Sequence, residues 1–97
     1  MELSTIIKGV VENKLKRLTK EGTIQQRTAV MAASQRMEGM TIHGIASQGN
    51  FTTAMVKHGN YMFVGIAKRN PKDNPNPKRG QYLAVSRAVR AALEAQL

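Results

Sequence analysis

The sequence predicts an α+β protein with one or two N-terminal helices, a three-stranded antiparallel β-meander and a C-terminal helix. Near both ends of the chain, apolar residues recur every three or four positions, which is the period of an amphipathic helix. Between them, β-branched and aromatic residues form three short runs separated by turn residues, which is typical of strands. The 97 residues are expected to form one domain: helical at 1–38, the meander at 39–68, a proline-rich loop at 69–79 and a helix at 80–96.

The first helix is expected over Ser4 to Lys20, and Gly22 is expected to end it. Ser4 or Thr5 can cap its first turn. Its apolar stripe is formed by Ile6, Ile7, Val10, Val11, Leu15 and Leu18. Cations near its C-terminal end suit the helix dipole, and these are Lys14, Lys16, Arg17 and Lys20.

A second, less regular helix is expected over Thr23 to Met37, with Thr23 as its cap and Gly39 as its break. Alanines favour the helix, but the apolar periodicity is poor. The segment is therefore expected either to pack mainly in a dimer or to be partly mobile.

The three strands are expected at Thr41–Ala46, Phe51–Lys57 and Tyr61–Ala67, with a turn at 47–50. Gly59-Asn60 fits a two-residue hairpin turn, because both residue types tolerate positive φ. The resulting pairs are His58 with Tyr61, Val56 with Phe63, and Met55 with Val64.

Both faces of this sheet are expected to be partly apolar. One face carries Phe51, Met55, Met62, Val64 and Ile66, and the other carries Ala54, Val56, His58, Tyr61, Phe63, Gly65 and Ala67. Helices on one side leave the second face open, so we expect a partner subunit there and hence a homodimer.

The last helix is expected to start at Gly80, after a loop that three prolines make stiff. Its apolar edge is Tyr82, Val85, Val89 and Leu93, beside a flank of small residues at Ala84, Ala88, Ala91 and Ala95. Asp73 or Asn76 is expected to cap it. Lys78 and Arg79 then lie at its N-terminus, where the helix dipole and unpaired N–H groups attract phosphate.

The net charge of +9 is the strongest global signal, and it favours a polyanionic partner such as DNA or RNA over a membrane surface. Residues 1–38 hold seven basic and four acidic residues, whereas 68–90 hold seven basic residues against Asp73 alone. A charge run is usually a solvated face, but a run with so little countercharge across a loop and the following helix favours a binding surface. The candidate nucleic-acid-binding residues are Lys57, Lys68, Arg69, Lys72, Lys78, Arg79, Arg87 and Arg90.

The residues of common enzyme chemistry are absent or scattered. The chain has no Cys, which excludes disulfides, thiolate metal sites and cysteine nucleophiles. His43 and His58 fall in expected strand or turn positions, and the carboxylates lack metal-ligand spacing. No Gly-rich phosphate loop, GxSxG or HExxH motif occurs. We therefore expect no catalytic residues, no metal and no cofactor.

Nothing in the sequence indicates a membrane or secreted protein. No apolar run approaches the roughly 20 residues of a membrane span. The N-terminus lacks the basic and apolar regions of a signal peptide. We expect a cytoplasmic protein.

The order of helix, three-stranded meander and helix resembles the double-stranded-RNA-binding domain. The block from Lys78 to Leu93 is similar to the last helix of that family, with an alanine-rich inner face. The resemblance implies that Lys78 and Arg79 contact phosphates of a duplex, with Arg87 further along the same side. The proline-rich loop and the extra segment at 23–38 depart from the family pattern.

A more local resemblance covers about 25 residues. The run from Gly65 to Asp73, followed by Asn76, Gly80, Ala84, Arg87 and Ala88, resembles a block in small phage and prophage proteins. In that block an Asn-Pro-x-Asp loop leads into a Gly-initiated helix with an Ala-x-x-Arg-Ala core. The resemblance implies a phage-encoded accessory protein, acting in the host cytoplasm.

We therefore expect a non-enzymatic protein that binds the phosphate backbone of duplex DNA or RNA with little sequence specificity. The alternative is an interaction factor whose basic face docks on a host enzyme and modulates or inhibits it.

Overall fold

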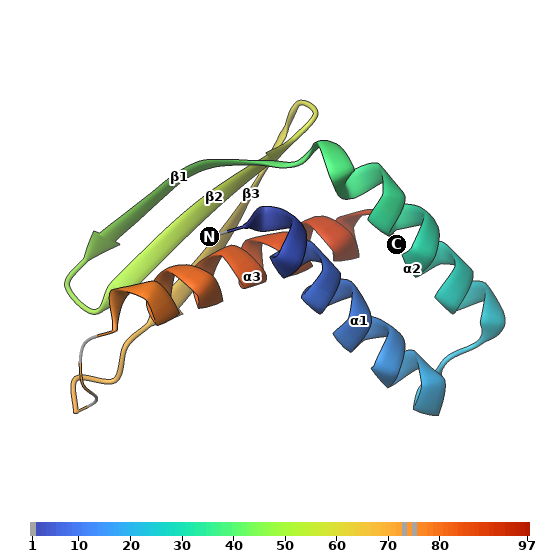
Figure 1. Cartoon of the computed structure of the whole chain (residues 1–97), viewed down its shortest axis with the longest axis horizontal. Helices are drawn as coiled ribbons and strands as arrows, with labels where there is room; N and C mark the ends of the chain where they lie inside the picture. The colour runs from blue at the N-terminus through green and yellow to red at the C-terminus, as the bar shows by residue number, and fades with distance from the viewer. Residues whose placement is uncertain (1, 73, 75) are drawn as a thin grey trace.

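The computed structural model in Figure 1 describes residues 2–72, 74 and 76–97, and for Lys20 and Glu21 it describes the backbone alone. In chain order the elements are α1 (Leu3–Glu21), α2 (Ile24–Arg36), the short 3-10 helix η1 (Met37–Gly39), β1 (Thr41–Gln48), β2 (Phe51–His58), β3 (Tyr61–Lys68) and α3 (Pro77–Ala95). The predicted α+β order is confirmed.

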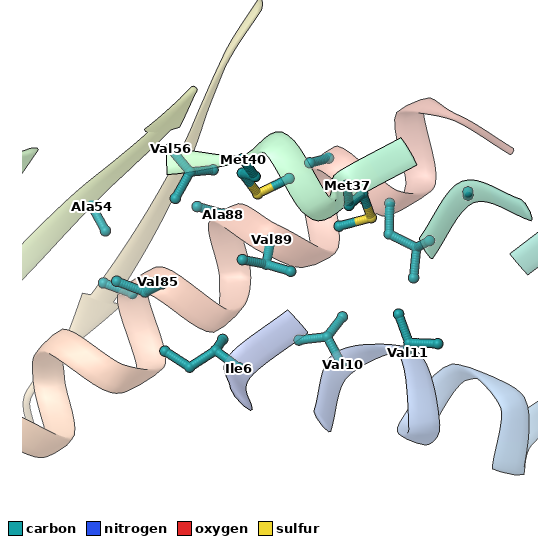
Figure 2. Packing of buried hydrophobic residues seen from close by; sticks show 14 of the residues in the cluster. Ile6, Val10, Val11, Met37, Met40, Ala54, Val56, Val85, Ala88 and Val89 are labelled. Atoms are coloured by element: carbon teal, nitrogen blue, oxygen red, sulfur yellow. The ribbon is translucent and has the colours of Figure 1, made fainter. Parts of the chain in front are cut away.

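Helix α3 lies between the sheet and α1, and the core is formed on both of its sides (Figures 1 and 2). Val56 from β2 and Ile6 from α1 approach it from opposite directions, with Val89 of α3 between them. All three side chains are buried. Helix α2 packs beside α1, and Val30 and Ala33 of α2 join the same core.

The strands form one antiparallel sheet in the order β1-β2-β3. The β2–β3 register is the predicted one, with His58 opposite Tyr61. Gly59 has φ +62° in that turn, which a glycine adopts without strain. Strand β1 runs two residues further than predicted, because Ser47 and Gln48 still pair with β2 and the turn shrinks to residues 49–50.

The two faces of the sheet are also as predicted. The face with Ala54, Val56 and Ala67 is buried against α3. Gly65 allows this packing, because a β-carbon there would overlap the backbone of α3 at Ala84 and Ala88. The opposite face is left uncovered: Phe51, Met62, Val64 and Ile66 are 43–52% exposed.

Two predictions about α1 and α2 have different outcomes. Helix α1 begins one residue before Ser4, at Leu3, and its N-cap is Glu2, whose side chain makes no capping bond. The expected cap at Ser4 or Thr5 was therefore wrong, since both lie inside the first turn. Helix α2 is capped as predicted by Thr23, in a reciprocal capping box with Gln26.

Helix α2 packs within the single chain. Its Arg27 donates to the Leu15 carbonyl oxygen at 3.1 Å and to Thr19 Oγ1 at 2.7 Å, which joins it to α1. The buried Met37 follows directly in η1. Val30 and Ala33 of α2 are thus buried within the single chain, whereas Ile24 and Met31 remain 84% and 52% exposed.

Helix α3 begins at Pro77, three residues before the predicted start at Gly80. The side chain of Asn76 accepts from the backbone N–H of Arg79 at 3.2 Å, and proline suits the first helical position because its φ is fixed there. The expected cap at Asn76 is confirmed, whereas Asp73 lies outside the described residues. The buried face is Ala84, Val85, Ala88, Val89, Ala92 and Leu93, while Tyr82, Ala91 and Ala95 are exposed rather than buried.

Candidate nucleic-acid interface

Three segments that are distant in sequence meet at one end of the molecule (Figure 1, left). These are the β1–β2 turn, the end of β3 and the first turn of α3. The backbone N–H of Arg69 donates to the Asn50 carbonyl oxygen at 2.7 Å, and its guanidinium donates to Asn50 Oδ1 at 3.0 Å. Gly80 of α3 lies against Thr52, whose Oγ1 would be 3.0 Å from a β-carbon at Gly80. These contacts fix both ends of the proline-rich loop.

This end of the molecule carries a cluster of five basic residues, which we call the basic end. Its members are Lys68, Arg69, Lys72, Lys78 and Arg79. Arg69 is half-buried, and the other four are exposed. Across residues 39–93, the part that the structure describes contains no carboxylate, and Asp73 lies outside it. The basic end therefore produces a positive potential with little local compensation.

The loop and the helix start present these cations differently. The backbone N–H of Lys72 donates to Asn70 Oδ1 at 3.0 Å, so a local turn holds the base of its side chain. Lys78 and Arg79 lie in the first turn of α3. Pro77 has no N–H, and Asn76 accepts the N–H groups of Arg79 and Gly80. The amides of Arg79 and Gly80 are therefore occupied, so an anion here would bind mainly to the side chains of Lys78 and Arg79.

Arg87 and Arg90 continue the basic surface along the exposed side of α3. Arg87 has a structural partner: its Nη1 donates to the Ile66 carbonyl oxygen at 2.6 Å, which joins α3 to β3. Arg90, one turn further, is exposed. Of the two, Arg90 is therefore the one whose charge is more available to a ligand.

Lys57 is not part of the basic end. It lies near the opposite end of β2, where it pairs with Met62 beside the β2–β3 hairpin, whereas Lys68 pairs with Phe51. These two pairs are six positions apart along the strand, which corresponds to about 20 Å. The structure thus divides the eight predicted residues into a cluster of five, two that extend it along α3, and one that lies apart.

The two histidines lie away from the basic end. His43 is exposed at the irregularity in β1 between Ile42 and Gly44. His58 Nε2 is 2.6 Å from the Arg36 carbonyl oxygen, so it joins the hairpin to the end of α2. In residues 2–72, 74 and 76–97, no group of three or more His, Asp or Glu side chains is placed to hold a metal ion. No helix in this part of the chain is long and apolar enough to cross a membrane.

Sequence reasoning missed the residues that assemble the basic end. Asn50 forms two hydrogen bonds with Arg69, although the two are nineteen positions apart. The sequence marks Asn50 only as a turn residue, and its role depends on the pairing of β2 with β3. The signal that was available is the strand register, because pairing Phe51 with Lys68 brings their neighbours Asn50 and Arg69 together.

The comparisons with known proteins found no match. No family model matches the sequence, and neither a curated protein nor a solved structure matches the chain.

Proposed function

We propose that this is a non-enzymatic nucleic-acid-binding protein that binds the phosphate backbone of DNA or RNA with little sequence specificity. The observation that supports the proposal is the basic end, where the end of β3, the loop and the first turn of α3 supply five basic residues with no carboxylate among the described residues around them. Because hydrogen bonds hold Arg69 and the turn from Asn70 to Lys72, little conformational entropy is lost in this part of the loop when it binds.

Phosphate contacts of this kind give affinity without sequence information. Lysine and arginine side chains that neutralise phosphates release counterions, so affinity falls steeply as salt rises. Such contacts position a protein on nucleic acid but do not read bases. With about five to seven phosphates neutralised, log K is expected to fall with log salt at a slope of roughly −4 to −6 on a duplex.

The biological context is part of the same proposal. The sequence resemblance to phage and prophage proteins supports an accessory factor that acts in the cytoplasm of a host. A homodimer is compatible with this role, because a second basic end would double the number of phosphates contacted.

The test is fluorescence anisotropy with labelled duplex DNA, duplex RNA and single strands at about 50 and 200 mM salt. The decisive variant combines Lys72→Gln, Lys78→Gln and Arg79→Gln, which are exposed positions in the loop and in the first turn of α3. We expect micromolar or tighter binding by the wild type. For the variant, we expect the salt slope to be smaller by about 2 to 3.

The matched control combines Lys8→Gln, Lys16→Gln and Arg17→Gln, three exposed positions on α1. It removes the same charge from a different surface and should leave most of the affinity intact. Equal losses in the two triple variants would mean that binding follows net charge alone, and would reject the basic end as a site. No binding at the lower salt would reject the function.

A second candidate function is docking on a host enzyme, which the protein would modulate or inhibit. It is favoured by the uncovered apolar face of the sheet beside the basic end, because protein interfaces combine an apolar centre with a polar rim. Its signature is a stoichiometric complex with one host protein that survives nuclease treatment. A complex that nuclease dissolves would instead support nucleic-acid binding.

A further inference from the structure

The uncovered side of the sheet, which we call the outer face, is largely apolar and carries a lysine at each end. Residues 51, 53, 55 and 57 of β2 lie on it opposite residues 68, 66, 64 and 62 of β3. Val64 and Ile66 are 49% and 52% exposed, although neither lies at an end of β3. Exposure at these positions means that no element among the described residues covers the face. Contiguous apolar patches of this kind mark binding surfaces.

An aromatic ring and a cation lie together at one end of the outer face. Phe51 is 48% exposed, and the Lys68 ammonium lies 5.7 Å from the centre of its ring. Lys68 also belongs to the basic end, so the outer face and the basic end are continuous. A ligand that follows the surface from the loop onto the sheet meets phosphate-binding groups first and then an exposed ring.

The charges of the outer face restrict what can occupy it. Lys68 lies at one end and Lys57 at the other, and the sequence has no Asp or Glu between residues 39 and 72. The preferred ligand must therefore be apolar and anionic at once. A second copy of this chain would place lysines against lysines across the interface, with no carboxylate on the face to compensate them.

A duplex is anionic but does not offer an apolar surface, because its bases are stacked inside and only its phosphates face a flat protein surface. A single strand meets them, because its unstacked bases offer flat apolar faces along an anionic backbone. Eight-residue strands are about 26 Å long, so the face is long enough for a short single-stranded segment to lie along it.

From these observations we infer that the outer face binds single-stranded nucleic acid, with a base stacked on Phe51 and the backbone running between Lys68 and Lys57. Stacking would displace the Lys68 ammonium from the ring toward the neighbouring phosphate. The aliphatic side chains of Val64 and Ile66 would support the next base. This inference rests on the proposed function. It specifies the ligand as a single strand that binds the basic end and continues along the outer face of the sheet.

The test compares the affinities of Phe51→Ala and Ile66→Ser with that of the wild type, for a labelled single strand of about twelve nucleotides and for a duplex of the same sequence. Both positions are exposed, so circular dichroism should confirm an intact fold. We expect the wild type to prefer the single strand. Phe51→Ala should weaken single-strand binding by about tenfold, which is typical of losing one stacked base, and leave duplex binding unchanged.

Two matched variants control the comparison. Ile24→Ser removes the same apolar side chain at a position of α2 that is 84% exposed, and it should change neither affinity. Phe51→Tyr keeps a ring for stacking and should retain single-strand binding. If Ile24→Ser weakened the single strand as much as Ile66→Ser, the outer face would not be the site.

The failures of the two proposals are distinguishable. If the protein binds both the single strand and the duplex and Phe51→Ala changes neither affinity, this inference is overturned, but the proposed function of the basic end stands. Binding of neither ligand would remove both. A dimer in analytical ultracentrifugation that Ile66→Ser dissociates would assign the outer face to a second copy and overturn the inference. The inference would also be overturned if anionic vesicles, or a host protein, bound the wild type but not Phe51→Ala, while the two proteins bound the single strand with equal affinity.

Discussion

Arg87 Nη1 donates a 2.6 Å hydrogen bond to the carbonyl oxygen of Ile66, and this contact fastens α3 to β3 at the edge of the sheet. A guanidinium bound to a backbone oxygen is held in place and partly neutralised by that dipole. Arg87 therefore contributes to the packing of the helix on the sheet, whereas the sequence alone suggested only a phosphate contact.

Removing that contact should affect stability more than binding. We expect Arg87→Ala to lower the free energy of unfolding by about 1 kcal/mol, because the hydrogen bond is exposed on one side. Its nucleic-acid affinity should fall by less than that of Arg79→Ala. Urea denaturation and anisotropy measure the two effects. Arg90→Ala is the matched control on the same helix, and it should leave stability unchanged; a stability loss equal to that of Arg87→Ala would contradict the role of Arg87.

The close approach of α3 to β3 depends on Gly65. A β-carbon at that position would overlap the backbone of Ala84 and Ala88 and would lie 3.0 Å from the Arg87 β-carbon. Backbone atoms of a packed helix do not move aside easily, so Gly65→Ala should destabilise the protein by about 3 kcal/mol. Thermal unfolding followed by circular dichroism checks this.

Gly9 provides the control for that substitution. It lies inside α1, and a β-carbon there would have no atom within 4 Å. Gly9→Ala should stabilise the protein by about 0.5–1 kcal/mol, because alanine has the higher helix propensity. A Gly65→Ala protein as stable as the wild type would mean that α3 packs further from the sheet than the structure has it.

The sheet could be predicted in detail because its determinants are local. Gly59-Asn60 is two residues long and tolerates positive φ, so only one register joins the flanking strands, and that register fixes which residues share each face. The loop and the helix start, which carry the predicted basic residues, also lie at the same end of the molecule, because they are consecutive in sequence. Both results follow from short-range rules.

The remaining errors come from two sources. The start of α3 was placed at Gly80 because Asn76-Pro77 was assigned to the loop, although Asn before Pro is also a cap followed by a first helical residue. Arg87 and Asn50 have their roles because α3 packs closely on β3 and because the β1–β2 turn lies beside the end of β3. No sequence pattern predicts how closely these elements approach one another. Lys57 was grouped with the other cations by charge, but its strand position places it at the opposite end.

Val89 tests the arrangement of the core. It is completely buried in α3, and in Figure 2 it lies between the sheet and Ile6 of α1. Val89→Asp would bury a carboxylate without a partner, at a cost comparable to the whole stability of a domain this small, so we expect an unfolded or aggregated protein. Ile24→Asp, at an exposed position on α2, should stay folded. A soluble Val89→Asp protein with a near-native circular dichroism spectrum would contradict the buried face assigned to α3.

Asn76 couples the stability of α3 to binding at the basic end. Its side chain caps the N–H of Arg79, and Lys78 and Arg79 are in the turn that this cap stabilises. Asn76→Ala should lower the free energy of unfolding by about 1 kcal/mol and weaken nucleic-acid binding, because the first turn frays and its two cations lose their fixed positions. Anisotropy and urea denaturation on the same preparation measure both.

Asn76→Asp separates the two effects. Aspartate caps as well as asparagine, and its charge suits a helix N-terminus, so stability should equal or exceed that of the wild type. The added carboxylate lies beside Lys78 and Arg79 and competes with phosphate for them, so affinity should fall, most strongly at low salt where the charge is least screened. Stability retained with affinity lost would support phosphate binding by the first turn of α3. Full affinity in Asn76→Asp would instead mean that nucleic acid does not reach this turn, and the loop cations alone would have to account for binding.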